Sequence, residues 1–377
     1  MKKGMHTILL PTIVLIFGLV ACQPAVAPVG SASTITPTQV SSPTATLAPS
    51  PTLVPSATVL SPTRTLPPEP SLTPTDAPPT FTPTPVDPYQ PYTIDALTQR
   101  KYGSGTLEIV ETIAENSYFT RYLFKYPSDG LTIYGFLNIP VGDGPFPVVI
   151  AVHGWVDPAI YNTLDYTTHY ADELARQGFF VLHPNLRGYP PSDMGDNTYR
   201  VGMAVDVLNL LALVRAEAGK TAPLQQASVE RVGLWGHSMG GGVITRVMVV
   251  DPTVDAVVLY GAISGNTRQT WEWLAWWSSG EMGAFELAAT PEMLVRISPD
   301  AHYDRVASAV SIHHGRNDEV LPLRWARETC EQLTALGKTV ECFYYKNQPH
   351  TFDGEADVLF MQRVTRFFRT YLLEKDV

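Results

Sequence analysis

The chain has 377 residues, of which 26 are Lys or Arg and 36 are Asp or Glu, so its formal net charge is −10. The basic residues form no stripe, which argues against nucleic acid as a partner. The three cysteines and nine histidines show none of the spacings typical of metal sites, so we expect neither a metal nor another cofactor.

The first 21 residues have the pattern of a targeting segment. Lys2 and Lys3 form a basic start, and residues 8–20 are apolar but too few to span a membrane comfortably. The segment Leu19-Val20-Ala21-Cys22 resembles a bacterial lipoprotein signal. This resemblance implies that residues 1–21 are removed and that Cys22 is acylated, anchoring the protein outside the cytoplasm on the bacterial cell membrane. The alternative is a short uncleaved anchor with an incidental cysteine.

Residues 22–91 are low in complexity. Residues 23–91 hold 18 of the 33 prolines, mixed with Thr, Ser and Ala and with few charges. Such a composition cannot bury enough apolar surface to offset the entropy lost on ordering. It therefore predicts a disordered, extended linker ahead of the globular part.

In residues 92–377, strand-like and helix-like runs alternate. This alternation predicts an α/β domain with a mostly parallel, eight-stranded sheet and helices on both faces. The expected strands are residues 122–126, 131–138, 148–152, 179–183, 232–235, 254–260, 310–314 and 340–345. The expected helices include residues 164–177, 199–218, 323–336 and 358–373.

Three segments depart from this alternation. The first two strands are expected to form an antiparallel hairpin through residues 127–130. Residues 92–118 are expected to be a helical or irregular lead-in packed on the domain, and the sequence does not assign them to a position in the sheet. Residues 265–303 predict a small cap insertion.

The pentapeptide Gly236-His237-Ser238-Met239-Gly240 lies between a strand-like run, residues 229–235, and a helix-like run, residues 241–249. A sharp turn between a strand and a helix exposes a serine hydroxyl above the sheet, and its small flanking residues avoid steric clashes. Ser238 is therefore the candidate nucleophile. The alternative is a glycine-rich turn that carries a surface serine.

A serine nucleophile needs a general base and an acid that orients the base. His350, the last histidine of the chain, follows the strand-like run 340–345. Asp318 follows the strand-like run 309–315, and its carboxylate would orient His350. Glu319 is the rival acid by adjacency and Asp304 by chain order.

Two backbone N–H groups are needed to hold the negative oxygen that develops during the reaction. The expected donors are Met239, directly after the nucleophile, and Trp155, in the loop after strand 148–152, with Gly154 as the alternative to Trp155. His153 and His237 are interpreted as structural histidines.

These motifs resemble an α/β-hydrolase, and more narrowly the catalytic domain of the prolyl oligopeptidase family of serine peptidases. The matching stretches are residues 185–189, 236–241, 297–299, 314–322 and 349–352, and the resemblance runs from Arg121 to the C-terminus. It implies a serine hydrolase that cleaves esters or peptide bonds through an acyl-enzyme. The β-propeller common in that family has no counterpart here, which keeps open a carboxylesterase acting on small acyl or aromatic esters. A non-catalytic binding module on the same fold is a third alternative.

Three further features leave alternatives open. Trp273 and Trp277, one helical turn apart in the cap insertion, could wall a substrate pocket or pack the cap's own core. Arg187 could line the site or form a structural salt bridge. Cys330 and Cys342 could form a disulfide or remain two separate thiols.

Overall fold

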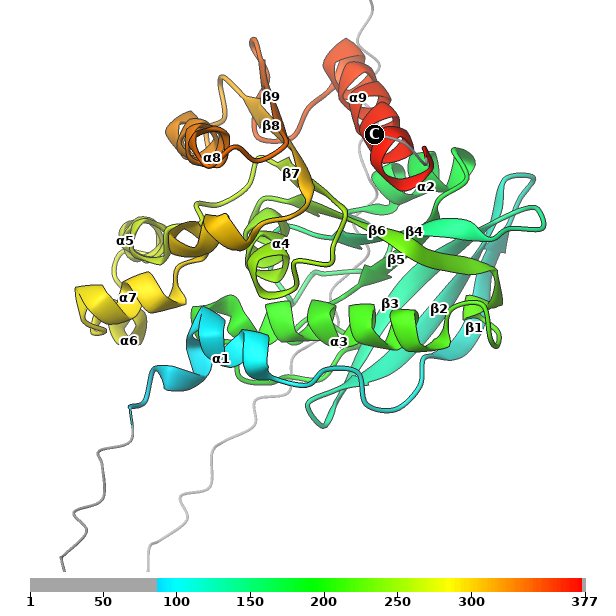
Figure 1. Ribbon diagram of the computed structural model, residues 1–377, viewed down its shortest axis with the longest axis horizontal. Helices are drawn as coiled ribbons and strands as arrows, with labels where there is room; N and C mark the ends of the chain where they lie inside the picture. Colours follow the sequence, from blue (N-terminus) through cyan, green and yellow to red (C-terminus); the bar gives the residue numbers. More distant parts are fainter. Residues whose placement is uncertain (1–86, 375–377) are drawn as a thin grey trace, which may run out of the picture. The chain divides into compact units, whose positions relative to one another are not determined.

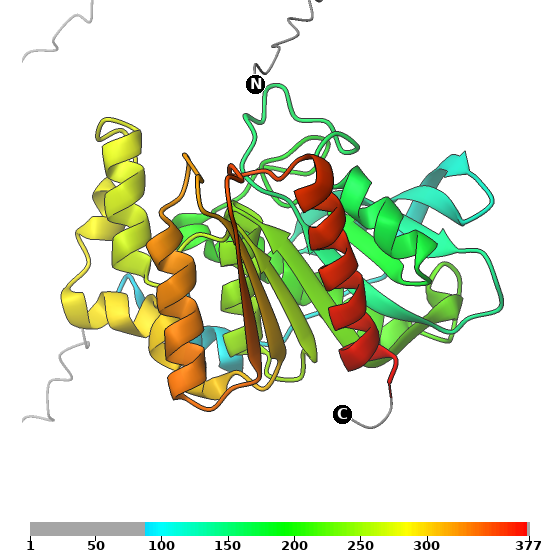
Figure 2. The same ribbon diagram turned by 90° about the horizontal axis from the view of Figure 1, so that it is seen from above.

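The computed structural model describes residues 87–374, which form the folded part of the chain shown in Figures 1 and 2. The expectations for the targeting segment, for Cys22 and for most of the linker fall on residues outside this range. Among the helices of residues 87–374, none is both long enough and apolar enough to cross a membrane.

The domain is built on one nine-stranded sheet (Figure 1). Its strands are β1 (Glu108–Glu115), β2 (Phe119–Ser128), β3 (Leu131–Pro140), β4 (Phe146–Val152), β5 (Phe180–Pro184), β6 (Ala227–His237), β7 (Ala256–Tyr260), β8 (Ala309–Gly315) and β9 (Val340–Tyr345). The order across the sheet is β1-β2-β3-β5-β4-β6-β7-β8-β9. Strands β4 to β9 run parallel to one another, whereas β1, β2 and β3 pair with their neighbours antiparallel.

The expected count of eight strands is wrong because the lead-in contributes one. Residues 92–118 contain a short helix, α1 (Ile94–Gln99), and strand β1, which pairs with β2 at the edge of the sheet. Most residues of β1 are exposed, and its register with β2 shifts twice. An edge strand with both faces near solvent needs no pattern of buried apolar residues. Such a pattern is what predicted the other strands. The hairpin between β2 and β3 is confirmed, and Asp129 and Gly130 form its turn at positive φ.

Helices cover both faces of the sheet, as expected, and divide the core into two layers (Figures 1 and 2). One layer packs α2 (Thr168–Arg176) and α9 (Gly354–Leu372) against the sheet. The other layer includes α3 (Val201–Glu217), α4 (Met239–Val250) and α8 (Leu323–Ala335). Because the central parallel strands are buried on both sides, they are almost continuously apolar.

Helices also form the insertion between β7 and β8. They are α5 (Thr267–Trp277), α6 (Ala284–Leu287), α7 (Pro291–Ile297) and the 3₁₀ segment Pro299–Arg305. Side-chain caps set two of the helix starts, since Asn266 accepts from the Gln269 N–H at 3.0 Å and Thr290 from the Met293 N–H at 3.3 Å.

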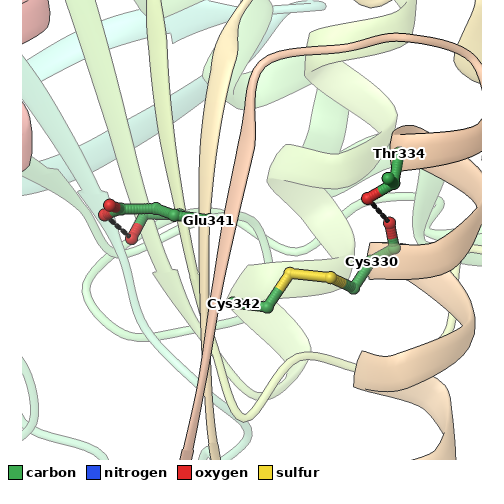
Figure 3. Close-up of a disulfide and its surroundings, with 5 residues drawn as sticks. Cys330, Thr334, Glu341 and Cys342 are labelled. Carbon is green, nitrogen blue, oxygen red and sulfur yellow. Dashed lines mark hydrogen bonds between the residues drawn. A yellow bond between two sulfur atoms is a disulfide. The ribbon is translucent and has the colours of Figure 1, made fainter.

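A disulfide joins Cys330 on α8 to Cys342 on β9, which decides between the two alternatives for these residues (Figure 3). Side chains alternate along β9, so the neighbouring Glu341 points to the opposite side of the strand and accepts a hydrogen bond from Ser311 at 2.7 Å. The disulfide therefore ties an outer helix to the last strand of the sheet.

We predict that the double variant Cys330→Ala, Cys342→Ala folds but melts at a lower temperature. The two cysteines are 12 residues apart, and closing a loop of similar size stabilises a protein by about 3 kcal/mol. For a domain of this size we expect a drop in Tm of about 5–10 °C in a thermal melt followed by circular dichroism. A double variant that melts at the wild-type temperature would contradict a stabilising disulfide.

Candidate active site

Ser238 lies at the turn between β6 and α4, where the predicted strand, turn and helix are present. Its backbone adopts φ 55° and ψ −118°, a conformation that is strained for a residue with a Cβ atom. The flanking glycines make this turn possible. A Cβ added at Gly236 would lie 2.6 Å from the Gly240 carbonyl oxygen, and one at Gly240 would collide with the carbonyl oxygens of Val152 and His153.

The structure brings Asp318 and His350 together at the ends of neighbouring strands. Asp318 follows β8, His350 follows β9, and the Asp318 Oδ2 to His350 Nδ1 distance is 2.7 Å. Asp318 Oδ2 also lies 3.1 Å from Nε2 of His314, a buried residue that the sequence analysis did not include in the site. The backbone N–H groups of Val320 and Leu321 donate to Asp318 Oδ1 at 2.9 and 2.7 Å.

These contacts keep the Asp318 carboxylate ionised. Burial alone would raise its pKa, but the hydrogen bonds with His314 and His350 outweigh burial and hold the pKa of Asp318 well below its usual range. An ionised carboxylate requires a proton on His350 Nδ1, which leaves His350 Nε2 free to accept a proton.

Neither rival acid contacts the His350 ring among the described residues. A carboxylate oxygen of Glu319 accepts a hydrogen bond from the His350 backbone N–H at 3.3 Å, so Glu319 contacts the loop rather than the imidazole. Asp304 lies in the 3₁₀ segment of the insertion, where its carbonyl oxygen accepts from Lys338 Nζ at 2.6 Å. The geometry therefore favours Asp318 over both.

In residues 87–374 no hydrogen bond joins the side chains of Ser238 and His350, although His350 contacts His237, the residue before Ser238. Gly261, next to the Ser238 turn, leaves room for the imidazole, since an added Cβ would lie 3.3 Å from the His350 ring. The Ser238 N–H donates to the Tyr260 carbonyl oxygen at 2.9 Å, which holds the turn beside this glycine. Hydrogen bonds between a nucleophile and its base are often long in a substrate-free site and tighten when substrate binds.

His237 is structural, as the sequence analysis expected, and its partners fix its protonation. Its Nε2 lies 3.1 Å from the His350 carbonyl oxygen, which can only accept, so Nε2 carries the proton. Nδ1 is then an acceptor, and the Tyr166 hydroxyl donates to it at 2.7 Å. Burial, together with the nearby His350 ring, lowers the pKa of His237 to about 3 and keeps the ring neutral. Tyr166 was missed because no motif marks it.

The residues expected to supply the two N–H donors lie next to Ser238. Met239 is the first residue of α4, and Trp155 lies in the loop after β4. An added Cβ on Gly154 would be 3.0 Å from Ser238 Cβ, so this loop passes close to the serine. The ring nitrogens of His153 lie 2.7 Å from the carbonyl oxygens of Gly154 and Asn185, which anchors the loop as expected.

A cavity of about 120 Å³ opens at Ser238. Its walls are mostly apolar and aromatic, and include Trp155, Trp273, Trp277 and Trp325 together with Met239, Leu274 and Leu321. Trp273 and Trp277 therefore line a pocket, which was one of the two alternatives. Trp325, at the start of α8, was not recognised because one tryptophan in an amphipathic helix looks like a core residue.

The geometry also decides between the two alternatives for Arg187. Arg187 is a structural residue, because it forms an ion pair of 2.8 Å with the fully buried Asp206.

A larger groove of about 580 Å³ between α2 and α9 includes His169 and Asp357 but neither Ser238 nor His350, so it is not the catalytic pocket.

Comparisons with known proteins agree with this architecture. Residues 147–290 match the family model described as alpha/beta hydrolase fold. A Synechocystis sp. protein provisionally described as a carboxymethylenebutenolidase is 22% identical over 268 residues, which are 66% of this chain and 96% of that protein.

Solved structures of esterases and peptidases are also similar. Acetyl xylan esterase 1 from Thermoanaerobacterium sp. has a TM-score of 0.56 and 18% identity, covering 74% of this chain and 93% of its own. The acylaminoacyl peptidase of Pyrococcus horikoshii has a TM-score of 0.53 and 18% identity, and this chain spans 52% of its length. The resemblance expected from the motifs is confirmed: the chain has an α/β-hydrolase fold.

Proposed function

We propose that this protein is a serine hydrolase that cleaves carboxylic esters through an acyl-enzyme. The observation that carries the proposal is the 2.7 Å contact between Asp318 and His350, next to a serine whose backbone is held in a strained turn. The ionised Asp318 leaves His350 poised as a base. A non-catalytic binding module would not need a histidine that is oriented by an ionised carboxylate, so we set that alternative aside.

The proposed reaction begins when His350 Nε2 takes the proton of the Ser238 hydroxyl. Ser238 Oγ attacks the ester carbonyl, and the carbonyl oxygen becomes an oxyanion facing the N–H groups of Met239 and Trp155. When the oxyanion collapses, the bond to the leaving alcohol breaks and His350 returns the proton to it. Water, deprotonated by His350, then attacks the acyl-enzyme, and the acid and free Ser238 are regenerated.

The pocket favours an ester with a small acyl or aromatic group, rather than a peptide, as the substrate. Its volume of about 120 Å³ is small, and its walls are mostly apolar. A peptidase that required a free amino terminus would need a carboxylate to bind it, for which Glu272, Glu281 and Glu286 would be the first candidates in the insertion. None of the three lines the cavity at Ser238.

Peptide hydrolysis is the second candidate function, supported by the similarity to acylaminoacyl peptidase. The lengths favour the ester alternative, since the match covers 93% of the acetyl xylan esterase chain but 52% of the peptidase chain. In the described chain, a short 3₁₀ helix (Gln90–Tyr92), α1 and β1 precede β2, and nothing there resembles the β-propeller common in the peptidase family.

We also propose that Cys22 carries the lipid anchor that was expected from the sequence. The support is the segment Leu19-Val20-Ala21-Cys22, followed directly by the proline-rich linker. More than one acyl chain on the cysteine would hold the protein firmly, since a single chain binds only marginally. The hydrolase would then act outside the cytoplasm on small ester substrates.

The variants Ser238→Ala and His350→Ala should each reduce kcat for a p-nitrophenyl ester by about 10⁴-fold or more. Because a triad acts as one unit, the double variant should be little worse than either single variant. Ser104→Ala and His169→Ala are the matched controls, since both residues are exposed and neither lines the cavity at Ser238. Wild-type turnover by a folded Ser238→Ala protein would show that another residue is the nucleophile.

Esters should be cleaved faster than amides that share the same acyl group, because an alcohol is the better leaving group. The measurement is kcat/KM for a p-nitrophenyl ester and the corresponding p-nitroanilide, together with aminoacyl and dipeptidyl anilides. A preference for the amide, or a strict requirement for a free amino terminus, would favour the peptidase alternative.

Expression in a lipoprotein-processing bacterium tests the anchor. Wild-type protein should incorporate labelled palmitate and partition with membranes, whereas Cys22→Ser should lose the label because the acylated thiol is gone. Equal labelling of both proteins would rule out Cys22 as the acylation site.

A further inference from the structure

Arg200 is a cation without a partner at the edge of the catalytic pocket. It precedes the first residue of α3, is partly buried, and lines the same cavity as Ser238. Within residues 87–374 its guanidinium makes neither a hydrogen bond nor an ion pair. Its guanidinium carbon lies 5.4 Å from the centre of the Trp271 ring.

Other buried arginines of this domain have oxygen partners. Arg187 pairs with Asp206 at 2.8 Å. Arg246, near Arg200, donates to the carbonyl oxygen of Ile297 at 2.7 Å and to that of Tyr199 at 3.3 Å. Arg200 differs from both, because its guanidinium has no oxygen partner among the described residues.

The backbone around Arg200 is held in an unusual conformation. Tyr199 and Arg200 both have positive φ, 54° and 56°, which is costly for two consecutive residues that are not glycine. Tyr199 is fixed at both ends, since its hydroxyl donates to the Glu286 carbonyl oxygen at 2.8 Å and its own carbonyl oxygen accepts from Arg246. The position of Arg200 at the cavity is therefore set by the fold.

Burial lowers the pKa of the Arg200 guanidinium, and the negative charge of Glu286 offsets this only in part. Removing a cation from water is expensive unless a counter-charge replaces the lost hydration. A guanidinium presents parallel N–H groups that match the two oxygens of a carboxylate.

We propose, building on the proposed ester hydrolysis at Ser238, that Arg200 binds a carboxylate of the substrate. The preferred substrates are then esters that carry a second, free carboxylate, such as half-esters of short dicarboxylic acids. A cavity of 120 Å³ holds about four groups the size of a water molecule or a methylene. This size matches an acyl chain such as glutaryl, with its ester carbonyl at Ser238 and its far carboxylate at Arg200, since both residues line the cavity.

The test compares monoethyl glutarate with diethyl glutarate, which have the same acyl chain but differ in the free carboxylate. For the wild type, kcat/KM should be higher for the monoester. In Arg200→Gln the ratio of the two values should fall at least about tenfold, the range expected for a lost charge-assisted hydrogen bond. Arg200→Lys, which keeps the charge, should retain part of the preference.

The matched control is Arg268→Gln. Arg268 is a partly exposed arginine of α5 that pairs with Glu272 at 3.5 Å and does not line the cavity. Its substitution also removes one positive charge, but from a residue outside the cavity, so the preference ratio should stay at the wild-type value.

Binding is measured separately by calorimetric titration of monoethyl glutarate into Ser238→Ala protein, with and without Arg200→Gln. The monoester could bind in a way that depends on Arg200 while the wild type hydrolyses neither ester. That result would contradict the proposed function but support Arg200 as a carboxylate-binding residue. Hydrolysis with the same preference ratio in wild type and Arg200→Gln would overturn the inference and leave Arg200 as a packing partner of Trp271. If Arg200→Gln does not fold, a wild type that prefers the diester would overturn it equally.

Discussion

The site depends on one backbone constraint, the strained turn that carries Ser238. This turn is possible only because Gly236 and Gly240 have no Cβ atoms, which would collide with the turn and with the loop after β4. It stops β6 at a fixed point and starts α4 there, so Ser238 and the first N–H groups of α4 are set together. Because β6, β7, β8 and β9 are parallel, the loops that follow β8 and β9 lie at the same edge of the sheet as this turn.

The second requirement is that the base, His350, is held rigidly, and Asp318 holds it. The carboxylate is held by the backbone N–H groups of Val320 and Leu321 and by two histidines, so its position depends on several contacts. His237 adds a link on the other side, since it hydrogen-bonds to the His350 backbone and to Tyr166. His350 is thus fixed through its ring and through its loop, while its Nε2 remains available for the serine.

Much of this arrangement could be predicted from the sequence because it depends on local patterns. The glycines around Ser238, the loop positions of Asp318 and His350, and the apolar central strands each follow from short-range chemistry. Strand β1 could not be predicted, since an exposed edge strand has no buried face to give it a pattern. His314, Tyr166 and Arg200 were missed for another reason: their importance comes from partners, or the lack of one, that only the folded chain brings near.

The central claim is that Ser238 is an activated nucleophile, and covalent labelling with a fluorophosphonate probe tests it most directly. The folded protein should react with the probe, and mass spectrometry of its peptides should place the adduct on Ser238, with none on the Ser238→Ala variant. Asp318→Asn should react much more slowly, because it no longer holds His350 in the tautomer that accepts the proton. Folded wild-type protein that does not react, or an adduct on a different serine, would contradict the account.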